Sequence, residues 1–204
     1  TAPSGFIAAH LKQVYDKEAF LTIHENYDWL IRESKNPIFK DTWSNLDGII
    51  RVNEKDLSLL NNFSDNVVSI HNGFDDVRFK EIEILDARNY LNLNSDVKII
   101  FSLGHLIPRK GFDVLLKSIK NLRKVRKDFK LFIGGDGPSR KYLQKYIDRN
   151  DMHYAKLIGR ISNAELPYWM FSCNLFVLTS HSEGNPTVMF EALGCGKPVL
   201  STDV

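Results

Sequence analysis

The sequence predicts an α/β protein in which two successive halves each build a parallel sheet covered by helices. Short apolar runs alternate with longer amphipathic stretches along the chain, which is the pattern of repeated βαβ units. The run at 97–103 (VKIIFSL) is apolar at consecutive positions, as expected for a strand that is buried on both faces. The turn signal at 71–75 (HNGFD) separates the two halves.

The first half is expected to hold three strands and two helices. The helices are predicted at 7–14 and 55–61. The strands are the three short apolar runs at 19–24, 47–52 and 67–71. A charged segment at 76–96, with a helix at 84–93, is expected to link the halves.

The second half is expected to hold five strands separated by helices. The strands are predicted at 97–103, 129–134, 155–159, 174–179 and 198–201. The helices are predicted at 112–126, 138–150 and 163–170, with one more after the Gly-Asn-Pro turn at 184–186. In a parallel sheet of this kind, ligands bind at the carboxyl ends of the strands.

Composition excludes few classes of protein but favours a globular protein of the cytoplasm. The 204 residues are 43% hydrophobic and 25% charged, which is ordinary, and a net charge of +2 gives no reason to expect a nucleic-acid partner. Cys173 and Cys195 are too few for a disulfide framework and indicate a reducing compartment. No apolar run approaches the roughly 20 residues of a membrane span, and no signal peptide is recognisable. A first residue other than Met, and an end directly after an apparent strand, predict an internal fragment.

The segment at 181–197 (HSEGNPTVMFEALGCGK) says most about function. Asn185 suits a helix N-cap and Pro186 the first helical position, so that Glu183 precedes the helix and Glu191 lies about a turn and a half inside it. The unpaired amides of the first turn, beginning at Thr187, and the helix dipole favour an anion there. A carboxylate on each side suits a diphosphate flanked by two polyols, which is the layout of a nucleotide sugar.

This E-x7-E pattern, followed by ALGCGKPV, resembles the signature of retaining glycosyltransferases of family 4, which have the GT-B fold of two Rossmann-like parallel-sheet domains facing a cleft. The resemblance implies that Glu183 contacts donor-sugar hydroxyls and Glu191 the nucleotide ribose. The alternative is a capped surface helix with two solvated glutamates, but the turn, the small residues after Glu191 and the strand at 198–201 favour the glycosyltransferase.

The same resemblance implies a domain layout in which both domains are incomplete. Residues 1–75 would be the C-terminal part of the acceptor-side Rossmann-like domain. Residues 76–96 would be the linker region. Residues 97–204 would be the donor-nucleotide-binding domain without its C-terminal end. The fragment alone is expected to be inactive.

The loop at 104–111 (GHLIPRKG) resembles the family's G-R-x-x-x-x-K-G loop, whose cations grip the donor diphosphate. Lys110 matches the lysine and would neutralise charge on the leaving group. Its alternative is a surface lysine, although a cation at a helix start is disfavoured without an anion partner. His105 stands where arginine is usual, so either Arg109 supplies the second contact or a protonated His105 pairs with phosphate.

Other strand ends carry further candidates. By the resemblance, Arg160 and Ile161 would lie against the nucleotide base, and His24 would face the donor sugar, although a lone histidine is more often structural. The G-D-G-P turn at 135–138 lacks a dinucleotide fingerprint and is expected to be structural, with Gly137 allowing an unusual backbone angle. The predicted catalytic residues are Glu183, Lys110 and His24. The predicted donor-binding residues are Gly104, His105, Arg109, Lys110, Arg160, Ile161, Glu183, Gly184, Asn185, Pro186, Thr187 and Glu191.

The predicted function is transfer of a hexose from a UDP- or GDP-sugar to a sugar or lipid-linked acceptor. No H-E-x-x-H motif or convincing D-x-D pair occurs, so neither a metal nor a cofactor is expected. The basic run at 117–130 is interpreted as a solvated helix face, and lipid-linked acceptors leave peripheral contact with the inner face of the membrane open. Two alternatives remain: a non-catalytic nucleotide-sugar-binding protein, and another GT-B enzyme such as a nucleotide-sugar epimerase or a phosphorylase.

Overall fold

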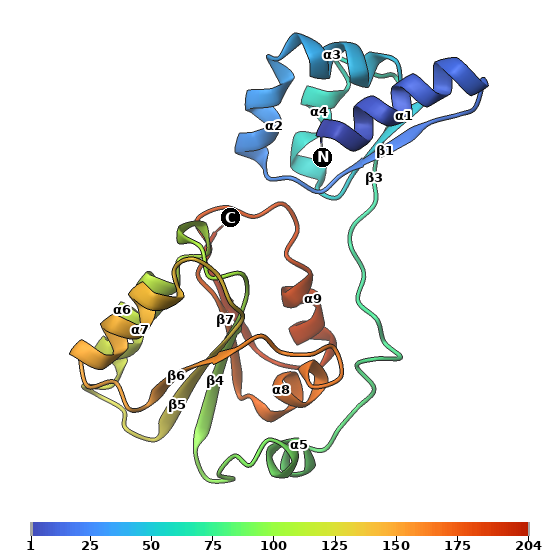
Figure 1. Cartoon of the computed structure of the whole chain (residues 1–204). Helices are drawn as coiled ribbons and strands as arrows, with labels where there is room; N and C mark the ends of the chain where they lie inside the picture. The colour runs from blue at the N-terminus through green and yellow to red at the C-terminus, as the bar shows by residue number, and fades with distance from the viewer. Residues whose placement is uncertain (1, 204) are drawn as a thin grey trace. The chain divides into compact units, whose positions relative to one another are not determined.

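The computed structural model describes residues 2–203 and divides into two units, each with its own parallel sheet (Figure 1). Unit 1 consists of the chain up to Gly73 together with Ser182–Pro186. Unit 2 consists of Phe74–His181 and the chain from Thr187 onward. The boundary at Gly73 lies inside the turn signal at 71–75.

Unit 1 is a three-stranded parallel sheet with helices against it, in the strand order β1-β2-β3. Phe20 pairs with Gly48, and Ile49 pairs with Val67. The strands are β1 (Phe20–Ile23), β2 (Gly48–Arg51) and β3 (Val67–Ser69). The helices are α1 (Ala2–Tyr15), α2 (Tyr27–Ser34), α3 (Pro37–Ser44) and α4 (Leu57–Leu60), the last preceded by a 3₁₀ turn at Glu54–Asp56.

Helices α2 and α3 are absent from the elements that the sequence predicts, although their capping signals are present. The Asn26 side chain accepts a hydrogen bond from the Trp29 amide at 2.9 Å, and Asn36 accepts one from Ile38 at 3.1 Å, with Pro37 next in the chain. Each helix has only eight residues, which is too short for its apolar period to stand out.

A buried ion pair joins the carboxyl ends of two strands of unit 1. Arg51, at the end of β2, donates from Nε and Nη2 to Asp56 Oδ2 at 3.0 and 2.5 Å. Its Nη1 donates to the Ile23 carbonyl at the end of β1, at 2.8 Å. The Arg51 side chain is fully buried, so these bonds replace its hydration and hold the two strand ends together.

Unit 2 is a five-stranded parallel sheet in the order β6-β5-β4-β7-β8. The strands are β4 (Lys98–Leu103), β5 (Phe129–Gly134), β6 (Ala155–Gly159), β7 (Leu175–Leu178) and β8 (Val199–Ser201). The helices are α5 (Ile84–Tyr90), α6 (Phe112–Leu122), α7 (Arg140–Arg149), α8 (Leu166–Ser172) and α9 (Thr187–Gly194), with a 3₁₀ turn at Pro108–Lys110. All five predicted strands of the second half are present.

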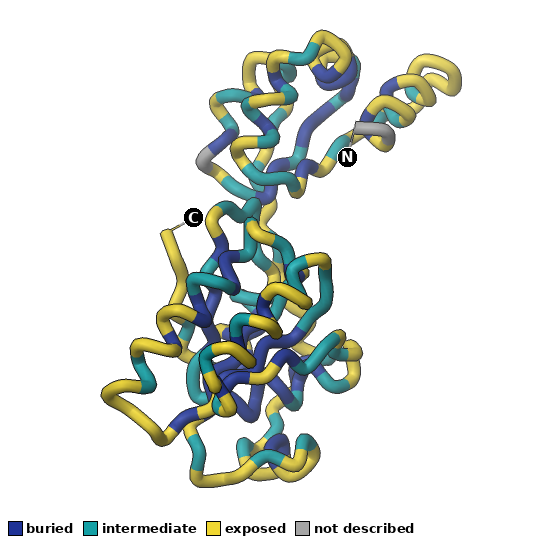
Figure 2. The backbone as a smooth tube through the Cα atoms, turned by 60° about the vertical axis from the view of Figure 1, so that its left-hand side comes forward, coloured by how far each residue is buried: buried dark blue, intermediate teal, exposed yellow. Residues whose placement is uncertain are grey.

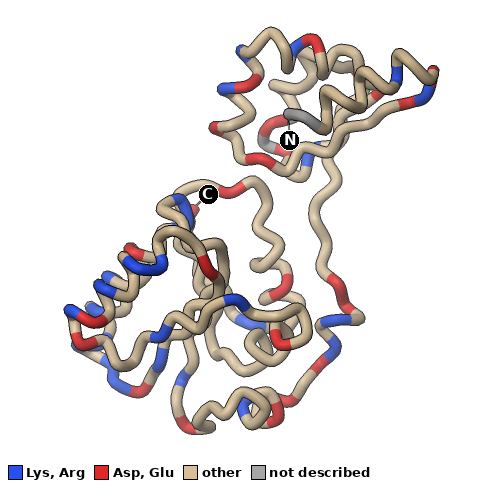
Figure 3. Tube along the Cα trace, viewed as in Figure 1, with Lys and Arg blue, Asp and Glu red and all other residues tan. Residues whose placement is uncertain are grey.

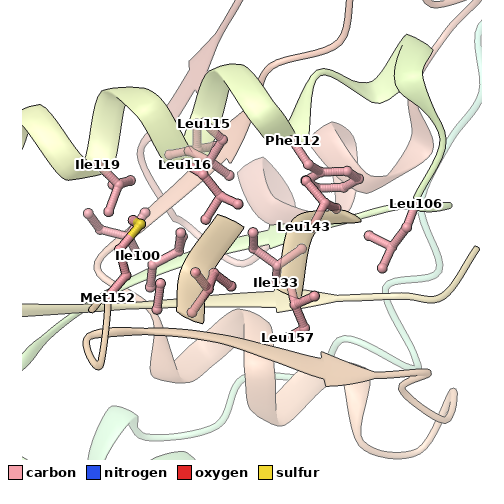
Figure 4. Close-up of a cluster of buried hydrophobic side chains, with 14 of the residues drawn as sticks. Ile100, Leu106, Phe112, Leu115, Leu116, Ile119, Ile133, Leu143, Met152 and Leu157 are labelled. Carbon is pink, nitrogen blue, oxygen red and sulfur yellow. The ribbon is translucent and has the colours of Figure 1, made fainter. Parts of the chain in front are cut away.

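Both faces of the unit 2 sheet are buried, because the pleat sends alternate side chains to opposite sides. Along β4, Ile100 contributes to the core beneath α6 and α7, whereas Ile99 and Phe101 contribute to the core beneath α8. Figure 4 shows Leu115, Leu116 and other side chains of α6 directed onto the strands of the first core. In Figure 2 the buried residues follow these strands. Residues 97–103 are therefore apolar because this strand is buried on both faces, as the sequence predicts.

Arg88 fastens α5 to this sheet. Its Nε donates to the Ser172 carbonyl at 3.1 Å, its Nη2 to Asn174 Oδ1 at 2.8 Å, and its Nη1 to the Ser95 carbonyl. Asn174 Oδ1 also accepts from the Ile99 amide at 2.8 Å. The end of the segment predicted as a linker is thus part of the second unit.

Candidate active site

The strand order of unit 2 creates a switch point beside β4. The chain runs from β4 outward through β5 to β6 and then returns to β7 on the other side of β4. The loops that follow β4 and β7 therefore leave the sheet in different directions, and the crevice outside such neighbouring carboxyl ends is where ligands bind in open α/β sheets. The loop after β4 holds Gly104, His105, Arg109 and Lys110, and the chain after β7 leads to α9 and Glu191.

Backbone contacts fasten the Lys110 loop to the end of β7. The His181 amide donates to the Arg109 carbonyl at 2.8 Å, and Thr179 Oγ1 makes a longer bond of 3.4 Å to the Lys110 carbonyl. Gly111 has a φ of 62°, and a Cβ at this position would lie 1.9 Å from the Thr179 carbonyl oxygen. Only glycine fits there, and the close approach sets the direction in which α6 begins.

The G-D-G-P turn supports the base of the same loop. The Leu106 amide donates to the Asp136 carbonyl at 2.9 Å, and the Ser139 amide donates to the Leu106 carbonyl at 2.8 Å. Gly137 has a φ of 156°, so the predicted unusual backbone angle is confirmed. Gly135 lies directly against the start of the loop, since a Cβ added to Gly135 would be 1.9 Å from the Gly104 carbonyl oxygen. The turn is a structural support, as the sequence predicts.

The side chains of the loop differ in exposure. Lys110 is half-buried, and its Cδ and Cε lie 3.7 and 3.8 Å from the position of a Cβ on Gly104, so its aliphatic stem covers that glycine. Arg109 is also half-buried, whereas His105 is exposed. A cavity of about 430 Å³ opens beside the loop. It is lined by Ile107, Pro108, Arg109, Phe112, Asp113, Ser139, Tyr142, Leu143 and His181.

Glu191 is buried and paired with a residue that the sequence does not single out. Its exposed fraction is 8%, and its Oε1 lies 2.6 Å from Nη2 of Arg78. Burial raises the pKa of the Glu191 carboxyl above its ordinary value, and the charge and hydrogen bond of Arg78 oppose that rise. Arg78 belongs to the segment predicted as a linker, and no local pattern marks it as a partner of a glutamate 113 residues away.

The chain around Glu183 belongs to unit 1, where it lies against His24. A Cβ on Gly184 would lie 2.4 Å from the His24 carbonyl oxygen and 3.0 Å from that of Glu25. Asn53 Nδ2 donates to the Gly184 carbonyl at 3.2 Å, and Asn72 Nδ2 donates to the Asn185 carbonyl at 3.1 Å. Sequence reasoning assigned neither asparagine to the site: Asn53 belongs to no motif, and Asn72 belongs only to the turn signal at 71–75.

The predicted cap of α9 is wrong in detail. The helix begins at Thr187, so Pro186 precedes it and is not its first residue. Asn185 is turned away from the helix, because its Nδ2 donates to the Val52 carbonyl of unit 1 at 2.7 Å. A contact distant in sequence has taken the side chain that local reasoning assigned to the cap. Before α8, Ser162 and Glu165 bond reciprocally as a capping box, and the helix becomes regular at Leu166.

The candidate residues are therefore distributed over both units. Those in unit 1 are His24, Glu183, Gly184, Asn185 and Pro186. Those in unit 2 are Gly104, His105, Arg109, Lys110, Arg160, Ile161, Thr187 and Glu191. At the end of β6, Arg160 is exposed, while Ile161 is half-buried with its Cδ1 2.5 Å from the position of a Cβ on Gly134.

Burial makes the two thiols poor nucleophiles. It raises the pKa of Cys173 to about 12 and that of Cys195 to about 11, so both are neutral at physiological pH. Within residues 2–203, no group of three or more His, Cys, Asp or Glu side chains could hold a metal ion. None of the described helices is long and apolar enough to cross a lipid bilayer.

The basic run after residue 116 is partly neutralised by its neighbours. Lys117 pairs with Asp113 at 2.9 Å and Arg126 with Asp128 at 2.6 Å. The Arg123 guanidinium lies over the Tyr154 ring at 4.7 Å. Figure 3 shows the positive positions along α6 and α7 interspersed with negative ones. This arrangement agrees with the interpretation as a solvated helix face.

Comparison with known proteins gives matches along the whole chain. Residues 84–204 match the family described as glycosyl transferases group 1. An uncharacterized glycosyltransferase of Methanocaldococcus jannaschii is 30% identical over 205 residues, which cover 99% of this chain and 54% of the relative.

Two solved structures are similar over almost all of the chain. Anabaena HepE, in complex with UDP and glucose, has a TM-score of 0.84 at 20% identity, covering 98% of this chain and 57% of that one. Sucrose-phosphate synthase of Thermosynechococcus elongatus has a TM-score of 0.85 at 22% identity, covering 100% and 54%. The chain thus spans little more than half the length of each of these proteins.

Proposed function

The chain belongs to the glycosyl transferases group 1 family, and we propose that it is the nucleotide-sugar-binding part of a retaining hexosyltransferase resembling family 4. Its fold is GT-B, as the sequence predicts, with two parallel-sheet units and GT-B glycosyltransferases as structural neighbours. In this proposal residues 1–75 belong to the acceptor-side domain, 76–96 to the linker region and 97–204 to the donor domain. The finer statements below concern the donor, the reaction and the residues.

The proposed donor is a UDP- or GDP-hexose. The main support for a donor site is that the Lys110 loop is joined to the end of β7 at a switch point of the sheet. The His181 amide and the close approach of Gly111 to the Thr179 carbonyl make this connection. Lys110, with Arg109 or His105, would bind the diphosphate beside Gly104, and the first amides of α9, from Thr187, would add to it. HepE, a structural neighbour, was solved with UDP and glucose.

The two glutamates would recognise the sugar ends of the donor. Glu191 would accept hydrogen bonds from the ribose hydroxyls, and Glu183 from the hexose hydroxyls. Gly184, Asn185 and Pro186 would hold Glu183 in place, since the Gly184 carbonyl and the Asn185 side chain are anchored on unit 1. His24 would face the hexose, and Arg160 and Ile161 the base.

The proposed reaction keeps the anomeric configuration. The bond between the anomeric carbon and the diphosphate oxygen breaks, and the acceptor oxygen bonds to that carbon on the same face. The departing diphosphate takes the acceptor's proton. The protein would supply position and positive charge, with Lys110 and the α9 amides acting where charge develops, and without a metal ion. The acceptor would be a sugar or a lipid-linked sugar, reached at the inner face of the membrane in the second case.

The test compares the two glutamates in binding and in transfer. Glu191→Ala should weaken nucleotide binding by about 10- to 150-fold, because it removes hydrogen bonds to a charged acceptor worth roughly 1.5–3 kcal/mol. Glu183→Ala should mainly reduce transfer. Binding is measured by calorimetry with UDP and GDP. Transfer is measured with the donor sugar that gives the largest thermal shift among UDP-, GDP-, ADP- and TDP-sugars.

Glu81→Ala, at an exposed position of unit 2, is the matched control. Donor affinity and turnover that are the same in all three variants as in the unsubstituted protein would reject these roles. Binding without transfer or donor hydrolysis by the intact protein would favour a non-catalytic binding protein. Release of an isomerised nucleotide sugar would favour an epimerase.

A further inference from the structure

We propose that Arg78 is a positioning residue that holds the Glu191 carboxylate ready for the nucleotide ribose. The inference rests on the proposed function, in which Glu191 contacts that ribose. It adds a residue from outside the E-x7-E motif, on a segment whose sequence predicts only a linker. Both residues lie within unit 2.

In this pair, one oxygen of the Glu191 carboxylate is bonded to Arg78 and the other is available to a ligand. Arg78 Nη2 lies 2.6 Å from Glu191 Oε1, which is a short, charge-assisted hydrogen bond. No described residue donates to Oε2. A ribose presents two neighbouring hydroxyls as donors, so a carboxylate fixed through one oxygen can receive them without first losing rotamer freedom.

Arg78 is itself held by its own segment. Its amide donates to Asp75 Oδ1 at 2.9 Å, and the Phe79 amide donates to the Asp75 carbonyl at 3.0 Å, which closes a turn. The guanidinium lies over the Phe79 ring, 4.5 Å from its centroid, and that ring is 4% exposed in the core. The guanidinium therefore approaches Glu191 from a fixed direction.

The Nε of Arg78 adds a further observation. This atom is buried and has no hydrogen-bond partner among the described residues. A buried donor without a partner is costly and is found where structure is constrained for another reason. The side chain is thus kept in place by the Phe79 ring and by Glu191, and not by a full set of its own hydrogen bonds.

The positive charge of Arg78 also favours the ionised form of the buried Glu191 carboxyl. The groups that face the Glu191 carboxylate are Arg78 and the thiol of Cys195 at the end of α9, which is neutral. Burial raises the pKa of Glu191, so loss of Arg78 would raise it further. A protonated carboxyl is a weaker acceptor for hydroxyl donors. Nucleotide affinity should therefore fall as the pH decreases and Glu191 is protonated. In a variant without Arg78, this fall should occur at a higher pH than in the unsubstituted protein.

The experiment uses Arg78→Met, which keeps an apolar stem over Phe79, and Arg78→Lys, which keeps the charge. Arg126→Met removes an exposed arginine and is the matched control. Two quantities are measured on the full chain across pH. The first is the titration of the Glu191 carboxyl by ¹³C NMR, and the second is affinity by calorimetry for UDP and GDP.

Arg78→Met should shift the Glu191 titration to higher pH and weaken nucleotide binding at neutral pH by about tenfold or more. Arg78→Lys should recover most of the pH profile, and Arg126→Met should change neither quantity. A lower unfolding temperature with an unchanged Glu191 titration, or an unchanged affinity, would reduce Arg78 to a structural residue and overturn the inference.

Glu191→Ala separates the inference from the proposed function. If Glu191→Ala weakens binding and Arg78→Met does not, the role of Arg78 is wrong and the function stands. If neither change affects binding, or if the unsubstituted chain binds neither nucleotide, the role of Glu191 fails and the inference fails with it.

Discussion

Replacing Gly184 with alanine should release the loop that carries Glu183. In unit 1 the Gly184 backbone lies directly against the chain at the end of β1, and a Cβ there would be 2.4 Å from the His24 carbonyl oxygen. That position is about 1 Å short of an ordinary van der Waals contact. The opposing atoms are backbone, so no side-chain rotation can relieve the clash.

The size of the effect follows from the hydrogen bonds that the loop would lose. Moving away by that distance would break the hydrogen bonds from Asn53 to the Gly184 carbonyl and from Asn185 to the Val52 carbonyl. At roughly 0.5–1.5 kcal/mol each, the docked loop would lose about 1–3 kcal/mol. Forcing a methyl group into a close-packed site costs a similar amount, about 1–3 kcal/mol.

Limited proteolysis measures this quantity, because cleavage of a transiently opened segment follows the population of the open form. A loss of 1–3 kcal/mol corresponds to cleavage about 5- to 150-fold faster within residues 182–186. Gly73→Ala is the matched control, since a Cβ there meets nothing within 4 Å, and it also cancels the effect of alanine on the unfolded chain. Equal cleavage of this loop in the two variants would refute the reasoning.

Two further changes test the supports around the site. Gly111→Ala should lower the thermal midpoint by several degrees and weaken UDP or GDP binding. The reasons are a φ of 62° and a Cβ 1.9 Å from the Thr179 carbonyl oxygen, and a midpoint like that of Gly73→Ala would contradict them. Arg51→Met should destabilise unit 1 by about 3–5 kcal/mol in urea unfolding, because Asp56 is left as a buried, unpaired charge. Adding Asp56→Leu should recover much of that loss, whereas a double variant as unstable as Arg51→Met would show that the pair is not the cause.

The sequence predicted the fold of the second unit more fully than that of the first. Strands such as β4 and β5 are apolar on both faces and flanked by turn residues, so their local signal is strong. Helices α2 and α3 have eight residues each, and only their caps at Asn26 and Asn36 identify them. Helix α9 begins one residue later than the sequence predicts, and the side chain of Asn185 binds Val52, a partner 133 residues away.

The residues of the candidate site also differ in how well the sequence predicts them. Glu183, Glu191 and Lys110 stand out in the sequence because their motifs are local in the chain. Arg78 and Asn53 do not stand out, and Asn72 stands out only as part of a turn. The structure joins all three to the motif residues or to their neighbours. A resemblance to a motif reports which side chains are used, but not which other side chains hold them.

By itself the sequence determined the alternation of strands and helices, the two-part organisation and the placing of the acidic and basic residues at strand ends. These follow from short-range periodicity and from the few turn types that glycine and proline allow. Only the tertiary structure decided that Ser182–Pro186 belongs to the first unit and that Glu191 is buried against Arg78. Both sets of contacts join residues more than a hundred positions apart. They form because buried polar groups need partners, wherever in the sequence the fold supplies them.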